Sequence, residues 1–83
     1  MQLSDTQQNL LRAMASGRFL KSHRDIDGHK IYQLHALDGS SLPVRRATVE
    51  ALVERGLIDS NKKFPASTYW LTAAGRQAIA RQR

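Results

Sequence analysis

The chain has 83 residues, of which 41% are hydrophobic and 24% charged, and this composition is typical of one small folded domain spanning residues 1–83. Thirteen Lys and Arg against seven Asp and Glu give a net charge of +6, which favours a polyanionic partner. The absence of cysteine excludes a disulfide scaffold, a thiolate metal site and a cysteine nucleophile.

The sequence shows no membrane or export signal. It contains no run of about 18 apolar residues, the length that a spanning helix needs. The opening stretch MQLSDTQQNLL lacks the basic region and long apolar region of a signal peptide. We therefore expect a cytoplasmic protein that does not contact a membrane.

Residues 5–16 are predicted to form a helix. Ser4 and Gln7 have the spacing of a capping box, in which each side chain accepts a hydrogen bond from the other residue's backbone N–H. Gly17 suits the left-handed position that ends a helix. Three apolar residues follow one face at helical spacing: Leu10, Leu11 and Met14.

Residues 19–37 are predicted to form a β-hairpin. Asp27-Gly28 is a strong turn signal, because both residue types tolerate positive φ. The return strand spans about 30–37, and Asp38-Gly39 makes the next turn. Alternation places Tyr32, Leu34 and Ala36 on one face of this strand, and Ile31, Gln33, His35 and Leu37 on the other.

Residues 43–55 are predicted to form a second helix. Ser40 or Ser41 is placed to cap it, and Pro43 fits a first turn, where its missing N–H costs nothing. Gly56 would end the helix. Its core-facing residues would be Val49, Leu52 and Val53.

A second hairpin and a last helix complete the chain. Leu57-Ile58 is a short apolar strand, 59–67 is a polar loop, and 68–71 is a β-rich return strand. Thr72 then caps a helix over about 73–82. The predicted fold is a small α+β domain with the order α-β-β-α-β-β-α.

Two sequence motifs in the second half of the chain carry a resemblance to a known family. The first motif consists of Leu52, Gly56, Leu57 and Ile58, and the second consists of Tyr69, Leu71, Thr72, Gly75 and Arg76. At this separation the segment resembles the winged-helix DNA-binding domains of MarR-like and PadR-like bacterial regulators. The resemblance covers about 45 residues and implies a winged-helix-like fold and a small bacterial or phage transcription regulator.

A looser resemblance covers the whole chain. Its residues are Leu3, Ser4, Gln7, Asp27, Gly28, Gly39, Leu57 and Ile58. This spread pattern looks like the YjhX family of small bacterial proteins, which are described as toxins. It favours the order helix, hairpin, helix, hairpin.

The winged-helix resemblance implies a set of double-stranded DNA contacts. Helix 43–55 would be the recognition helix, with Arg45 and Arg46 in the major groove or on its phosphates. Ser41, beside the helix start, would hold a phosphate, and Lys62 and Lys63 would contact the backbone from the wing, 59–67. Residues 1–41 carry five cations and four anions, net +1, whereas residues 42–83 carry eight and three, net +5.

Other interpretations of the same residues stay open. Arg46 and Glu50 have the spacing of an ion pair within a helix, and lysines at a hairpin tip also protect a sheet edge from unwanted pairing. Trp70 is expected in the core or an interface rather than stacked on bases. The alternative function is a protein-interaction module, toxin-like or a phage-type inhibitor. Its contacts would be Ala47, Ala51, Tyr69 or Trp70. A homodimer is expected with the DNA-binding function, because two half-sites raise affinity and specificity.

We expect neither a metal site, a cofactor nor enzyme activity. The three histidines, His23, His29 and His35, are spaced six apart and fit no standard zinc pattern. Asp25 and Asp27 are explained more simply by turn chemistry than by acid–base catalysis. No nucleophile motif accompanies them.

Overall fold

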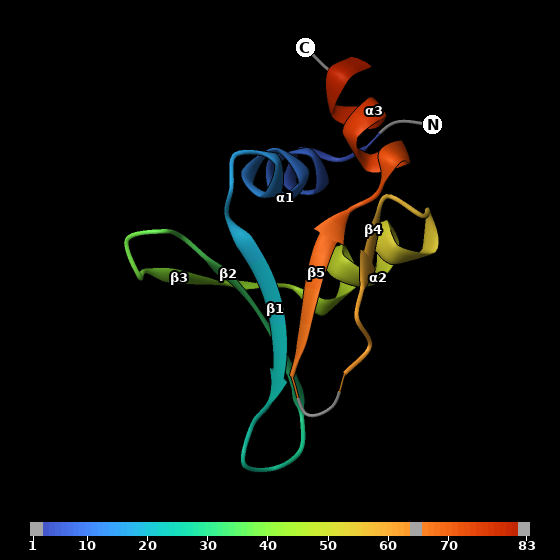
Figure 1. The fold of residues 1–83 in the computed structure, drawn as a ribbon. Coiled ribbons are helices and arrows are strands. Elements are labelled where there is room, and N and C mark those ends of the chain that lie inside the picture. Colours follow the sequence, from blue (N-terminus) through green and yellow to red (C-terminus); the bar gives the residue numbers. More distant parts are fainter. Residues whose placement is uncertain (1–2, 64–65, 82–83) are drawn as a thin grey trace.

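The structure, a computed structural model, describes residues 3–63 and 66–81 (Figure 1). This part of the chain forms a small α+β fold with three helices and a five-stranded antiparallel sheet of order β3-β2-β1-β5-β4. The elements are α1 (Asp5–Ala15), β1 (Phe19–Arg24), β2 (Lys30–His35), β3 (Ser41–Val44), α2 (Arg46–Glu54), β4 (Ile58–Ser60), β5 (Ser67–Leu71) and α3 (Ala73–Arg81).

The first helix matches its prediction closely. The Ser4 backbone N–H donates to Oε1 of Gln7 at 3.0 Å, and the Gln7 N–H donates to Oγ of Ser4 at 3.2 Å. This is the predicted capping box. The chain leaves α1 through Gly17, whose φ of +105° favours glycine.

The predicted order is wrong by one strand. Residues 43 and 44, the predicted start of the second helix, instead belong to β3, which pairs with β2 and places Leu42 opposite Leu34. The turn before β3 explains this, because Ala36 N–H donates to the Ser40 carbonyl at 2.9 Å and closes a hairpin. Pro43 is accommodated because β3 is an edge strand, where a missing N–H is tolerated.

The second helix therefore begins later than predicted. It spans Arg46–Glu54 rather than 43–55, and its N-cap residue is Arg45, which makes no side-chain capping bond. The predicted cap, Ser40 or Ser41, is wrong because both residues belong to the β2–β3 hairpin. The last helix begins at Ala73 as predicted, whereas residue 82, its predicted end, lies outside the described residues.

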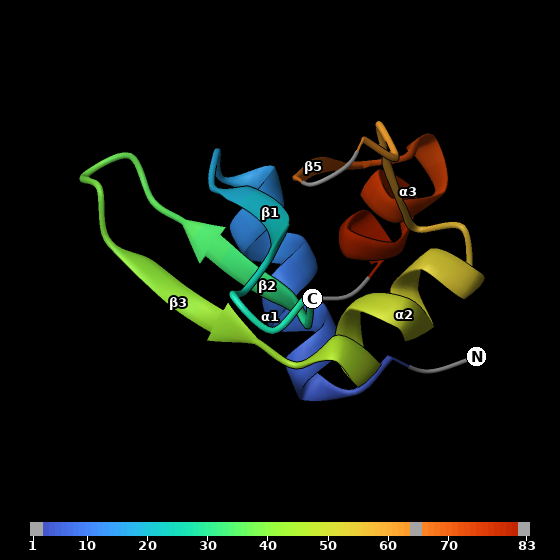
Figure 2. The ribbon, with the colours of Figure 1, turned by 90° about the horizontal axis from the view of Figure 1, so that it is seen from below.

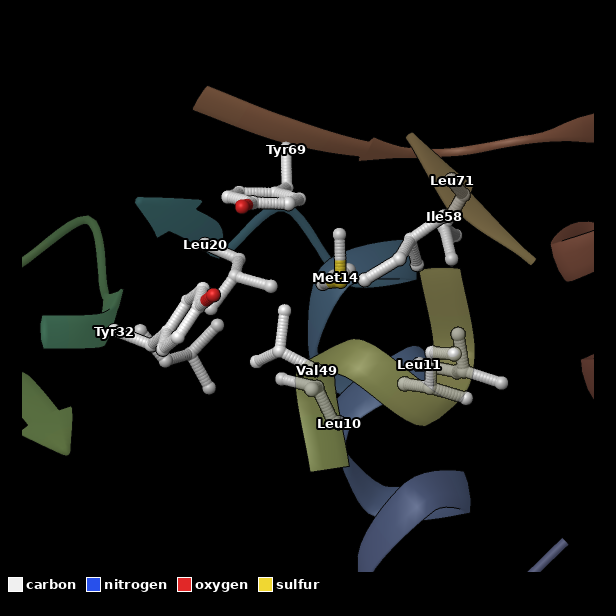
Figure 3. Packing of buried hydrophobic residues seen from close by; sticks show 11 residues of the cluster. Leu10, Leu11, Met14, Leu20, Tyr32, Val49, Ile58, Tyr69 and Leu71 are labelled. Atoms are coloured by element: carbon white, nitrogen blue, oxygen red, sulfur yellow. The ribbon is translucent and has the colours of Figure 1, made fainter. Parts of the chain in front are cut away.

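One face of the sheet forms the core with α1 and α2 (Figure 3). Leu11, Leu20, Val49 and Leu52 are fully buried, and they come from α1, β1 and α2. The predicted core residue Val53 is 43% exposed instead, since α2 turns Val49 and Leu52 inward. The rings of Tyr32 and Tyr69 also lie in this layer, with centroids 6.0 Å apart.

The two sequence motifs that carry the winged-helix resemblance contact each other. Thr72 Oγ1 donates to the Gly56 carbonyl at 2.6 Å and accepts from the Gly75 N–H at 3.1 Å. The Thr72 N–H also donates to the Leu57 carbonyl at 3.1 Å. Gly75 packs so closely on that carbonyl that a Cβ atom would collide with it. These bonds fix the start of α3 against the turn between α2 and β4.

Within the described ranges, none of the three helices is both long enough and apolar enough to cross a membrane.

Candidate nucleic-acid interface

Two hairpin ends meet at one end of the sheet and enclose a cationic pocket of about 220 Å³. In Figure 1 the β1–β2 turn and the first residues of β5 lie at the same end of the sheet, at the bottom of the view. The pocket is lined by four cationic residues, Arg24, Lys30, Lys62 and Lys63, and by three serines, Ser22, Ser60 and Ser67. No Asp or Glu is among these lining residues, so the pocket favours an anion.

Local hydrogen bonds fix the backbone of the wing at Lys63. Asn61 Oδ1 accepts from the backbone N–H of Lys63 at 3.2 Å and from that of Thr68 at 3.3 Å. Ser67 Oγ donates to the Lys63 carbonyl at 2.6 Å. Lys62 has a φ of +56°, which turns the chain sharply at this point. Residues 64 and 65 of the predicted wing lie outside the described residues.

The first hairpin supplies the other two cations. Arg24 and Lys30 are cross-strand partners at the end of the β1–β2 ladder. Arg24 donates to the Gly28 carbonyl at 3.0 Å, which anchors its guanidinium beside the turn. The Lys30 ammonium lies 5.5 Å from the centroid of the Tyr32 ring, within the range of a cation–π interaction.

The predicted helix cations lie elsewhere on the surface. Arg46 donates from Nε to Oε2 of Glu50 at 2.9 Å, which is the predicted pair within the helix. This hydrogen bond raises the pKa of Arg46. Arg45 is exposed and lines a different groove, between α1 and β3, together with Arg18. Neither Arg45 nor Arg46 lines the cationic pocket.

The helix and the pocket are connected through Lys30. A groove between α2 and the sheet is lined by Lys30, Tyr32, Glu50 and Glu54, so Lys30 borders both this groove and the cationic pocket. Ser41 is exposed in β3 opposite His35, and its end of β3 projects away from the β4–β5 loop (Figure 2). The structure thus brings Lys62 and Lys63 together and separates them from Ser41 and Arg45.

Sequence reasoning missed Arg24 and Lys30. Alternation along the predicted hairpin could have placed them on the same face as Tyr32. It could not show that the second hairpin would bring Lys62 and Lys63 against them, because β1 pairs with β5 across more than 40 residues of sequence.

The contact residues predicted for a protein-interaction module differ in their exposure to solvent. Tyr69 is only 7% exposed, so it is not a surface contact. Trp70, its neighbour in β5, is 46% exposed and points away from the core. Ala47 is exposed and Ala51 is partly buried.

Asp25, Asp27 and His29 bring their possible metal-ligating atoms within 4.8 Å of one another. Turn chemistry accounts for this cluster. Asp25 Oδ1 accepts from the backbone N–H of Asp27 at 2.9 Å and from that of His29 at 2.8 Å. Both hydrogen bonds lower the pKa of the Asp25 carboxyl, and the bond from the His29 N–H has the larger effect. All three residues therefore serve the β1–β2 turn.

Comparison with protein-family models, curated proteins and solved structures yields no match to this chain.

Proposed function

We propose that this chain is a cytoplasmic DNA-binding module, of the kind found in small bacterial or phage transcription regulators. The observation that supports it best is the cationic pocket, in which Arg24, Lys30, Lys62 and Lys63 converge with no carboxylate in the lining. Lys and Arg side chains that converge in this way are suited to the phosphates of a duplex.

The pocket would supply affinity and the helix start would supply further contacts. The Ser60 hydroxyl, which accepts from the Lys62 N–H, would donate to a phosphate oxygen and so add orientation to charge. Arg45 and Arg46 sit at the first turn of α2, where exposed guanidinium groups suit guanine edges or phosphates. Glu50 competes for Arg46, so Arg45 is the stronger candidate of the two.

The test is duplex binding as a function of salt, with matched double variants. A labelled random duplex is titrated by fluorescence anisotropy with the full chain, with Lys62→Gln/Lys63→Gln, and with Arg45→Gln/Arg46→Gln. The control is Arg12→Gln/Arg55→Gln, which removes the same charge from residues outside the pocket. The slope of log K against log salt is negative, and its magnitude should decrease by about 0.9 for every phosphate that a variant no longer neutralises.

We expect the magnitude of the slope to decrease by about 1.8 for the Lys62/Lys63 variant and to change little for the Arg12/Arg55 control. A decrease confined to the Arg45/Arg46 variant would move the interface to the helix. Equal decreases in all three variants would reduce the binding to net charge alone, and no binding at low salt would refute the proposal.

A further inference from the structure

The sheet has a second face, which α1 and α2 leave open. Leu20 and Tyr69 pair across β1 and β5 and point into the core, so their neighbours Phe19 and Trp70 point outward from adjacent strands. Phe19 is 48% exposed and Trp70 is 46% exposed. Figure 2 shows β1 and β5 on one side of the molecule and α2 on the other. Two large aromatic side chains therefore stand together in solvent.

Both rings line a cavity of about 190 Å³ at the end of the sheet near α1 and α3. Arg18, which follows α1, and Arg76, in α3, line the same cavity, and both are exposed. No Asp or Glu is among the residues that line this cavity, and the one carboxylate paired with either ring is Asp59, opposite Trp70 in β4. Aromatic rings and guanidinium planes are the groups on which proteins stack unpaired nucleobases.

The rest of this face favours a charged polymer over an apolar protein partner. The next cross-strand row contains Gln33, Lys21 and Thr68 in place of further apolar residues. The centre of a protein–protein interface is usually depleted of charge, whereas a track for a single strand combines stacking rings with cations. Lys21 is exposed two residues from Phe19 on the same face of β1, so it is placed to meet the phosphate next to a stacked base.

We infer that Phe19 and Trp70 stack unpaired bases of a single-stranded nucleic acid, and that Arg18, Arg76 and Lys21 neutralise its phosphates. This site does not depend on the proposed duplex binding. The cationic pocket contains Ser22 and Ser67, which are buried on the inner face of the sheet, whereas the two rings lie on the outer face.

Trp70 is the only tryptophan in the chain, so its fluorescence reports on this surface directly. The probes are dodecamers of thymidine and of uridine, added to the full chain at low salt. Stacking should quench the fluorescence of Trp70. Quenching by either probe supports the inference, and the ratio of the two affinities identifies the preferred sugar.

Variants then separate stacking from charge. Phe19→Ala and Trp70→Ala should each weaken binding of a labelled dodecamer about tenfold or more, because each removes a stacking platform. Trp70→Phe should restore most of the affinity, since it retains a ring. Leu37→Ala is the control, because Leu37 is 82% exposed and lies at the β2–β3 turn. Lys62→Gln/Lys63→Gln should keep the quenching even if it abolishes duplex binding.

The inference is overturned if saturating dodecamer leaves Trp70 fluorescence unchanged, or if both alanine variants bind like Leu37→Ala. It is also overturned if sedimentation shows that the ring variants convert a dimer to a monomer without changing affinity for the dodecamers, because the face would then serve self-association. Failure of duplex binding alone leaves these readouts intact, so the two proposals fail separately.

Discussion

The two faces of the sheet are built from the same strands and have opposite characters. In β1, Leu20 and Ser22 are almost fully buried, whereas Phe19 and Lys21 are exposed. In β5, Tyr69 is buried and Trp70 is not. Because side chains alternate along a strand, one backbone presents a buried face and an exposed face. Hydrophobicity alone therefore does not identify the core, since two of the largest apolar side chains in the chain contribute little to it.

The sharpest test of this contrast lies within one strand. Leu20→Ala should lower the free energy of unfolding by about 2–5 kcal/mol, because it leaves a cavity in a fully buried site. Phe19→Ala, at the neighbouring residue, should cost less than about 1 kcal/mol, since about half of its ring is already in water. Urea denaturation followed by circular dichroism measures both. Equal decreases would mean that the outer face is also packed.

A second prediction concerns the contact that fixes α3 on the turn before β4. Gly75→Ala should destabilise the fold by about 1–3 kcal/mol, because the new Cβ would collide with the Leu57 carbonyl. On helix propensity alone the same change would stabilise α3 by about 1 kcal/mol. The sign of the shift in thermal midpoint therefore shows whether the collision with the Leu57 carbonyl or the gain in helix propensity dominates. Ala74→Gly, at an exposed position of the same helix, is the control for propensity.

The smallest expected effect is a pH dependence of the β1–β2 turn, which lies outside the two faces of the sheet. The pKa of Asp25 lies below its ordinary value of 3.8, mainly through the His29 backbone hydrogen bond. A lowered pKa means that the ionised carboxylate favours the turn above the ordinary value, and that this contribution disappears as the pH falls through the lowered one. The amide signals of Asp27 and His29 should therefore shift in NMR spectra with a midpoint below 3.8.

Asp25→Asn provides the control for that titration. It should abolish the shift while leaving the buried residues of β1 and β2 unaffected, because the turn is exposed. A midpoint at or above the ordinary value would contradict the hydrogen bonds to the carboxylate.

Local signals predicted much of the fold. The Ser4–Gln7 capping box and the Thr72 cap could be predicted because each depends on residues three positions apart. The β3 strand could not, since Pro43 shortly after two serines fits a helix start as well as an edge strand. Only pairing with β2 decides between the two, and that pairing is a property of the folded chain.

The candidate sites were less predictable than the fold. Lys62 and Lys63 could be assigned to a hairpin tip from their neighbours. Their grouping with Arg24 and Lys30 depends on β1 pairing with β5, which no short pattern encodes. The exposure of Phe19 and Trp70 likewise depends on which face of the sheet the helices cover, and alternation shows only that two faces exist.

The two edge strands of the sheet also determine how the molecule can associate with copies of itself. One edge is β4, only three residues long, and the other is β3, where Pro43 interrupts a row of four. Neither edge offers the long, continuous ladder of backbone groups that seeds intermolecular strand addition and fibre growth. The sheet is therefore protected from growing sideways by strand addition at either edge.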